Sequence, residues 1–524
     1  MGALNFTGDD PCLFANDAPN FGGFVSGATV VEGNFWKMGQ LRAGDTMRLK
    51  RVSLDDALTL RQKVASYLAR IQRAIEENSF ESITGLESIS PSTDPDSAIL
   101  WDKAAQGTFP RTRYRQSGDN SMMIEYGNEE FDINHKCRVR KIDEALHSST
   151  TPAWLKDNLI NTVSCGTTLM LFYNGVVVSR PDLIKHLQTL ETLVGDLSAI
   201  KVPTRRFRLP LTFASKEQDE ATQRYMQTQR PHAPYLPSNI DYVARNNAFT
   251  TSQLKQNLLS SPLMAMVVGF FSGNTVSLPV DPRKRMQCAK ANPSRVFTPA
   301  GTLGWGGSCA SIYPTDSPGG YMYLARTIPC FDYLGYRRHF SPEKPWLFED
   351  FDLLEFYEVG EGDFKSKLAA FDAGTYDFEF EATEFDMAEH NRFLTQVAGE
   401  VEEIRAKQRI AQAEMIEAEN ASLARWREEK ARDKVDSGTV ETLLQDPRVT
   451  AVTAPVDANV WKVLVEVGQE VKAGQTVAIL EAMKLEVNVD LGKGVKIGAK
   501  VEKVLAVPGE TVRAGERIVL VREG

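Results

Sequence analysis

The chain has 524 residues, about three to four domains' worth, and its 42% apolar, 25% charged and 9% aromatic residues are typical of a folded globular protein. A formal net charge of −9, from 60 basic against 69 acidic residues, argues against the positively charged surface that nucleic acids and anionic membranes require. We therefore expect proteins and small molecules as partners, and neither nucleic acid nor a membrane.

The first three quarters of the sequence predict a β-rich α+β fold. Helical patterns cover residues 53–77, which begin with the start signal Ser53-Leu-Asp-Asp, and residues 181–193. The segment SISPSTDPDS at 88–97 is a loop or linker. Strand-like runs lie at 122–126, 168–178 and 353–359.

A charged stretch at 394–434 predicts one long helix, because it is rich in Ala, Glu, Lys, Arg and Gln and contains no proline. Apolar residues recur along it at spacings of three, four and seven, which gives a single narrow stripe. At 1.5 Å per residue such a helix would run roughly 60 Å. It is either a free lever that connects two bodies or a solvated helix packed on one of them.

Residues 449–524 contain an internal repeat with an offset of 41 residues. GQEVKAG at 468–474 returns as GETVRAG at 509–515, and KVL at 462–464 returns at 503–505. Two similar halves of short alternating strands with Gly turns predict one small all-β sandwich or flattened barrel.

The six cysteines are scattered without a CxxC motif, and the six histidines are equally dispersed. This pattern suits reduced thiols in the cytoplasm and predicts no metal site. The N-terminus lacks the basic and apolar regions of a signal peptide. HExxH, GxxxxGK and GxSxG are also absent, so metalloprotease, P-loop and serine-hydrolase functions have no support.

The sequence EAMKLEV at 481–487 lies between the two repeated motifs. A lysine flanked by Ala482 and Met483 in this position resembles the biotinyl-lysine of a biotin carboxyl carrier domain, which makes Lys484, Met483 and Ala482 the expected cofactor-binding residues. A ligase must reach the amine, so Lys484 belongs at the tip of an exposed hairpin. Lipoyl domains share this fold and place a lysine at the same turn, usually after Asp, and Met483 favours biotin.

Four blocks of the preceding part resemble the carboxyltransferase region of urea carboxylase, a biotin enzyme fused to or partnered with allophanate hydrolase. They run from Asn20 to Asp45, from Tyr114 to Gly127, from Tyr225 to Ile240 and from Asp281 to Thr327. The fourth block is the longest and contains the sequences DPR, NPSR, GWGG and YPTDSPGGY. No segment resembles a biotin carboxylase, so we expect this part to use the carboxyl group rather than to load it onto biotin.

The resemblance implies a carboxyltransferase and carrier component that moves the carboxyl group from carboxybiotin to urea or a related amide, with an allophanate-like product. The Gly-Gly pairs offer backbone amides that can bind a carboxylate or a developing oxyanion. Without the resemblance, tight turns in a β-rich domain also explain the fourth block. The expected substrate-binding residues are Arg283, Arg295, Gly306, Gly307, Gly319 and Gly320, and the expected catalytic residues are Asp316, Asn274 and Asn20.

Two positions depart from the family pattern. Asn274 stands where the family has Asp, and a neutral amide cannot serve as a base. Trp305 stands where the family has Ile, and its bulk could fill part of a cavity. Only about residues 10–50 match the first carboxyltransferase half. The alternative is therefore a truncated, catalytically degenerate paralogue that acts as a biotinylated scaffold or regulatory binding module.

The resemblance also implies a domain organisation and partners. We expect a biotin carboxylase domain or subunit, a biotin protein ligase, and urea or a related small amide as partners. The expected domains are a remnant of the first carboxyltransferase half at 1–52, a helix and linker at 53–105, the second half at 106–392, a helical connector and linker at 393–448, and the carrier domain at 449–524.

Biotin attached through an amide bond to Lys484 adds about 226 Da to the chain. We expect the intact mass of the chain, purified from cells that contain biotin ligase, to show this increase. Peptide mapping should place it on Lys484. An unmodified lysine, or the mass of a lipoyl group, would contradict the assignment.

Overall fold

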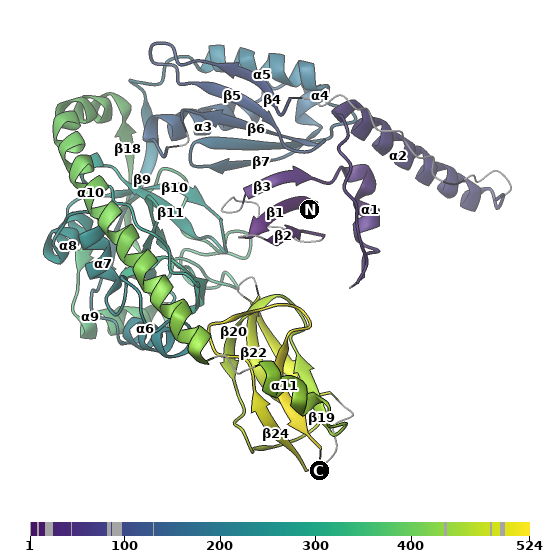
Figure 1. The fold of residues 1–524 in the computed structure, drawn as a ribbon. Helices are drawn as coiled ribbons and strands as arrows, with labels where there is room; N and C mark the ends of the chain where they lie inside the picture. The colour runs from purple at the N-terminus through teal and green to yellow at the C-terminus, as the bar shows by residue number, and fades with distance from the viewer. Residues whose placement is uncertain are drawn as a thin grey trace. The chain divides into compact units, whose positions relative to one another are not determined.

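The computed structural model describes residues 2–7, 10–15, 25–42, 44–80, 85, 97–128, 130–433, 437–482, 485–492 and 498–523. The chain forms two compact units, Met1–Pro203 with Glu384–Phe393 and Thr204–Thr383 with Leu394–Gly524. Helices and mostly antiparallel sheets occur in both units (Figure 1), and the predicted multidomain α+β class is confirmed.

The first unit contains two antiparallel sheets, in the strand orders β2-β1-β3 and β4-β5-β6-β8-β7. The strands are β1 (Ala3–Thr7), β2 (Asp10–Leu13), β3 (Val25–Thr29), β4 (Ile99–Lys103), β5 (Thr112–Gln116), β6 (Ser121–Tyr126), β7 (Leu159–Cys165) and β8 (Thr168–Tyr173). The helices are η1 (Glu32–Asn34), α1 (Phe35–Met38), α2 (Leu54–Glu76), α3 (Ile133–Leu146), α4 (Ala153–Lys156) and α5 (Arg180–Val194).

Alternating apolar residues explain why one face of the five-stranded sheet is buried. Leu169, Leu171 and Tyr173 of β8 are buried, and the residues between them are partly exposed. This is the period of two that a half-buried strand requires. Apolar residues of α3 and α5 pack against this face and complete one core.

The second unit is built on an eight-stranded sheet in the order β16-β13-β14-β11-β10-β17-β9-β18. β9 and β17 are parallel neighbours, and a separate two-stranded ribbon pairs β12 with β15. The strands are β9 (Lys201–Leu211), β10 (Leu263–Val268), β11 (Thr275–Pro279), β12 (Arg295–Thr298), β13 (Thr302–Gly306), β14 (Cys309–Ile312), β15 (Ser317–Gly319), β16 (Met322–Arg326), β17 (Leu353–Glu358) and β18 (Glu379–Asp386). The helices are α6 (Lys216–Thr228), α7 (Asn239–Asn246), α8 (Thr251–Leu259), η2 (Pro282–Lys284), α9 (Glu361–Asp372), α10 (Met387–Asp433) and α11 (Ser437–Leu444).

The predicted helices are present. α2 begins after Ser53, whose hydroxyl oxygen accepts a hydrogen bond from the Asp56 N–H at 3.1 Å, as an N-cap residue does. α5 covers the second helical pattern. The charged stretch forms α10, which begins at Met387, earlier than its sequence pattern indicated.

The apolar stripe of α10 is used for packing. Val397 and Val401 are buried, and the Gln408 side chain donates a hydrogen bond to the Arg285 carbonyl oxygen at 2.9 Å. From Leu394 onward the helix therefore belongs to the second unit and is not a free lever over this length.

The C-terminal repeat forms two four-stranded sheets around a common apolar core. β20, β21 and β22 begin at residues 458, 470 and 476, and β24, β25 and β26 begin 41 residues later in each case. The halves also exchange strands, since β21 pairs with β24 and β25 pairs with β20. The predicted flattened barrel is confirmed. Its strands are β19 (Val449–Thr453), β20 (Ala458–Val463), β21 (Glu470–Val471), β22 (Thr476–Ala482), β23 (Leu485–Asp490), β24 (Ala499–Val504), β25 (Thr511–Val512) and β26 (Arg517–Arg522).

Among the described residues, no helix is both long enough and apolar enough to span a bilayer.

Trp305 lies inside the core of the second unit. Its side chain is 0% exposed on β13, and its indole N–H donates to the Met286 carbonyl oxygen at 3.1 Å. The bulk of this residue therefore fills the hydrophobic core.

Trp305→Ala is expected to destabilise the protein by about 3–5 kcal/mol, because the cavity left by a large core residue closes only partly. Tyr336→Ala is the matched control, since Tyr336 lies in the same unit and is 78% exposed. Urea denaturation followed by circular dichroism measures both. Equal losses in the two variants would contradict the core position of Trp305.

Candidate functional site

The β12–β15 ribbon brings together several residues of the fourth sequence block. Arg295 of β12 is the register partner of Gly319 on β15. A Cβ atom at Gly319 would lie 2.1 Å from the Tyr313 hydroxyl oxygen, and one at Gly306 would lie 2.5 Å from the Tyr321 ring. These two glycines therefore let tyrosine rings pack against the backbone beside Arg295.

Arg295 is buried among tyrosines, with 4% of its surface exposed. Its guanidinium carbon lies 3.8 Å from the centroid of the Tyr323 ring, which is the geometry of a cation–π contact. The guanidinium also donates to the Tyr321 carbonyl oxygen. Its Nε–H has no hydrogen-bond partner among the described residues.

A small hollow lies against this arginine. Its volume is about 10 Å³, which is close to the space of one water-sized group. An anion oxygen of that size could occupy the hollow. The residues that line it are Ala221, Arg224, Tyr225, Gln229, Arg295, Val296 and Phe297.

Arg295 differs from the other buried arginines of the described chain, which are Arg138, Arg230 and Arg326. Each of those three forms an ion pair with a glutamate, at 2.8, 2.6 and 3.0 Å. Arg295 has no carboxylate partner in the described ranges. A buried charge without a counterion is unfavourable.

The surrounding tyrosines are neutral hydrogen-bonding groups. Burial raises the pKa of Tyr225, of Tyr313 and of Tyr321 above that of an exposed phenol. Burial likewise raises the pKa of the Cys288 thiol. These side chains are therefore poor bases and poor nucleophiles at neutral pH.

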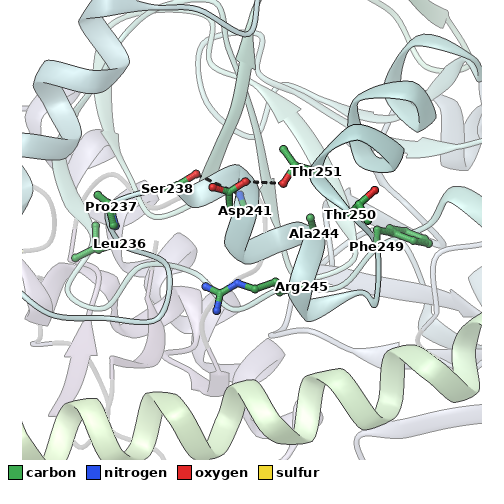
Figure 2. A pocket seen from close by; sticks show the side chains of 9 residues that line it. All are labelled: Leu236, Pro237, Ser238, Asp241, Ala244, Arg245, Phe249, Thr250 and Thr251. Carbon is green, nitrogen blue, oxygen red and sulfur yellow. Dashed lines mark hydrogen bonds between the residues drawn. The ribbon is translucent and has the colours of Figure 1, made fainter.

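A larger groove lies on α7 and α8 (Figure 2). Its volume is about 620 Å³, and none of the residues predicted as catalytic or substrate-binding lines it, although Leu236, Pro237 and Ser238 belong to the third sequence block. Asp241 crosses the groove to accept a hydrogen bond from the Thr251 hydroxyl at 2.5 Å. The groove is wide, but its polar groups are partly paired with one another. The lining residues are Leu236, Pro237, Ser238, Asp241, Ala244, Arg245, Phe249, Thr250 and Thr251.

Asn239 connects the start of α7 to the backbone of Tyr323 on β16. It follows Ser238, which lines the groove, but its own side chain is buried. Its amide oxygen accepts from the Tyr323 N–H at 2.9 Å, and its amide nitrogen donates to the Tyr235 carbonyl oxygen at 2.7 Å. Asn239 thereby supports the ring on which Arg295 lies.

Two predicted site residues, Asn274 and Arg283, have polar partners other than Arg295. Asn274 is buried beside β14, where its amide nitrogen donates to the Ser311 hydroxyl at 2.6 Å and to the Ile312 carbonyl oxygen at 3.0 Å. Arg283 pairs with Asp281 at 2.8 Å and with Glu400 of α10 at 2.9 Å. Asn274 therefore joins strands, and Arg283 joins η2 to α10.

Three other predicted residues, Asp316, Gly307 and Gly320, already form hydrogen bonds with backbone groups. The exposed carboxylate of Asp316 accepts from the Ala300 N–H at 2.7 Å. The Gly307 N–H donates to the Cys288 carbonyl oxygen at 2.9 Å, and the Gly320 carbonyl oxygen accepts from Ala291 at 2.7 Å. Binding an oxyanion at Gly307 would require its present bond to open.

The remaining predicted residues concern the carrier hairpin and the N-terminal block. Ala482 ends β22 and pairs with Leu485, the first residue of β23. Met483 and Lys484, which join these strands in the sequence, and Asn20 lie outside the described residues.

The tyrosines around Arg295 were not predicted as site residues. Tyr321 and Tyr323 are two apart, and Tyr313 lies only eight residues before Tyr321. This clustering of large aromatic residues around a Gly-Gly pair was the available signal. Only the tertiary structure, which places Arg295 among these rings, shows that the tyrosines belong to one site.

Comparison with known families accounts for three parts of the chain. Residues 1–51 match the carboxyltransferase domain, subdomain A and B, and residues 112–339 match the carboxyltransferase domain, subdomain C and D. Residues 447–521 match the biotin-requiring enzyme family. The chain thus combines carboxyltransferase domains with a carrier domain for covalently attached biotin.

Individual relatives narrow this class. The chain is 48% identical to a putative urea carboxylase of Emericella nidulans, over 100% of this chain and 43% of that protein. It is 31% identical to the urea amidolyase of Lachancea kluyveri, over 100% of this chain and 28% of that protein. The crystal structure of the Kluyveromyces lactis urea carboxylase superposes with a TM-score of 0.74 at 28% identity, over 99% of this chain and 44% of that one.

The chain is homologous to the carboxyltransferase and biotin-carrier region of urea carboxylases, which confirms the resemblance seen in the sequence motifs. It spans less than half the length of each of these relatives.

Asn274→Asp is expected to destabilise the protein by about 1–3 kcal/mol at neutral pH, because a carboxylate would face the Ile312 carbonyl oxygen without a proton to donate. Burial would raise the folded-state pKa of the new carboxyl above its unfolded value. The penalty should therefore be absent below the unfolded pKa and grow as pH rises through the folded pKa.

Urea denaturation at about pH 4, close to the unfolded pKa of Asp, and at about pH 8 measures this dependence. Asn158→Asp is the control, because Asn158 donates to the Trp154 carbonyl oxygen in an exposed position. A penalty at position 274 that does not depend on pH would contradict the assigned contact.

Proposed function

We propose that this chain transfers a carboxyl group, delivered by its own biotin, to urea or a related small amide. Homology to urea carboxylases supports the reaction class. The local support is the buried guanidinium of Arg295, which has a water-sized hollow beside it and no carboxylate partner among the described residues.

Arg295 would hold the carboxylate of the transferred group. Its Nε–H is available, and its position inside the protein strengthens a charge-assisted hydrogen bond by keeping water away. The ring of Tyr323 and the carbonyl oxygen of Tyr321 fix the plane of the guanidinium. Such preorganised donors are the groups that stabilise developing negative charge.

Biotin, when bound, supplies an activated carboxyl group. Lys484 is the proposed attachment residue, with Met483 and Ala482 beside it. A biotin protein ligase would attach the cofactor, and a biotin carboxylase domain or subunit would load it. Asp316 remains the proposed contact to the acceptor amide, because its carboxylate is exposed near the ribbon.

Arg295→Met is expected to lower urea-dependent turnover by about 100-fold, because it removes the donor for the carboxylate. The assay combines the biotinylated chain with a biotin carboxylase, ATP, bicarbonate and urea. Arg295→Lys keeps the charge but not the planar set of donors, and we expect it to retain part of the rate.

Arg245→Met is the matched control, since Arg245 lines the larger groove, and we expect its turnover to equal that of the unchanged chain. Circular dichroism checks that each variant is folded. If Arg245→Met loses turnover and Arg295→Met keeps it, the acceptor site lies in the groove. If the fully biotinylated and carboxylated chain shows no response to urea, the assignment of urea fails and the scaffold alternative gains support.

A further inference from the structure

α10 contacts the rest of the second unit at several points along its length. The Arg283–Glu400 ion pair and the bond from Gln408 to Arg285 hold its first half. Further along, Met415 packs against the core of the unit. A further contact follows at Glu419, where the helix carboxylate pairs with a buried arginine.

Arg230 is the arginine that receives Glu419, and its side chain is 0% exposed. Its two terminal nitrogens donate to the two Glu419 oxygens at 2.6 and 3.1 Å, which is a bidentate pair. One of these nitrogens also donates to the Asn292 carbonyl oxygen at 2.9 Å. Arg230 therefore connects α10 to the segment that precedes β12.

That segment, residues 292–294, has each of its carbonyl oxygens held by a side chain. Arg230 binds the carbonyl of Asn292, the Tyr225 hydroxyl binds that of Pro293 at 2.7 Å, and the Gln229 amide binds that of Ser294 at 3.0 Å. The next residue is Arg295. The backbone that presents Arg295 is thus fixed from outside the ribbon.

We propose that α10 positions the carboxylate-binding arginine: Glu419 orients Arg230, Arg230 holds the Asn292 carbonyl, and this segment presents Arg295 to the hollow. The inference rests on the proposed function in one respect, namely that Arg295 binds the transferred carboxyl group. Glu419 and Arg230 are positioning residues, and the helix that leads to the carrier domain also shapes the site that the carrier serves.

The inference predicts which kinetic constant changes. Glu419→Gln leaves Arg230 with a neutral partner and loosens its hold on Asn292, so Arg295 is less well placed when the carboxyl group is transferred. We expect kcat to fall about tenfold to a hundredfold, since small misplacements at a reacting centre have effects of this size. The KM for urea should hardly change, because Arg295 holds the carboxyl group and not the urea.

Glu417→Gln is the matched control. Glu417 is an exposed glutamate on the same helix, and we expect both constants to remain unchanged in this variant. Hydrogen–deuterium exchange of the peptide that covers residues 291–298, measured on the full biotinylated chain, gives a readout that needs no turnover. Exchange there should be faster in Glu419→Gln than in the unchanged chain or in Glu417→Gln.

A double variant separates positioning from simple stability. Arg230→Met combined with Glu419→Met leaves no unpaired buried charge, so its melting temperature should recover relative to Glu419→Gln. Its kcat should stay low, because the Asn292 carbonyl oxygen has lost the charged donor Arg230 and keeps only the Tyr235 hydroxyl, at 3.2 Å. A double variant with full kcat would overturn the inference.

The inference would also be overturned if hydrogen–deuterium exchange at residues 291–298 were as slow in Glu419→Gln as in the chain without the substitution. If the unchanged chain shows no urea-dependent turnover, the proposed function fails while the exchange measurement still decides whether α10 holds the segment.

Discussion

A guanidinium enclosed by aromatic rings, with no carboxylate partner among the described residues, is the constraint on which the proposed chemistry of the second unit depends. Arg295 is oriented by the face of Tyr323 and by a backbone carbonyl oxygen, neither of which neutralises its charge. The glycines of the neighbouring strands allow the rings of Tyr313 and Tyr321 to approach closely. Burial of an unpaired charge lowers the stability of the folded protein, and binding of an anion would reduce this penalty. A carboxyl group in transfer is such an anion.

The second structural constraint on this unit is the packing of the long helix α10 against it. Along α10, carboxylates meet arginines of the body at Glu400 and Glu419, and these pairs differ in their surroundings: Arg283 is partly exposed, whereas Arg230 is excluded from water. Exposed pairs contribute little, while a buried bidentate pair fixes geometry. The helix that leads to the carrier domain is therefore also a structural part of the second unit.

The carrier domain and the helices were predictable because their signals are local. The repeated Gly turns and alternating residues of 462–474 and 503–515 specify strands and turns within a few residues, and β20 and β24 begin at equivalent positions. The site was harder to predict. Arg230 and Glu419 are 189 positions apart, and Asn274 meets Ser311 across 37 positions, so their contacts arise only from the tertiary fold. Trp305 shows the same limit, because the sequence gives its size but not whether it faces a pocket or the core.

A crystal structure of the chain with allophanate, the product expected when urea accepts the carboxyl group, tests the central claim most directly. The account predicts electron density for the product carboxylate within hydrogen-bonding distance of the Arg295 guanidinium, with Nε–H donating to one of its oxygens. Density for the product in the groove beside Arg245, with the Arg295 Nε–H still unpaired, would contradict it.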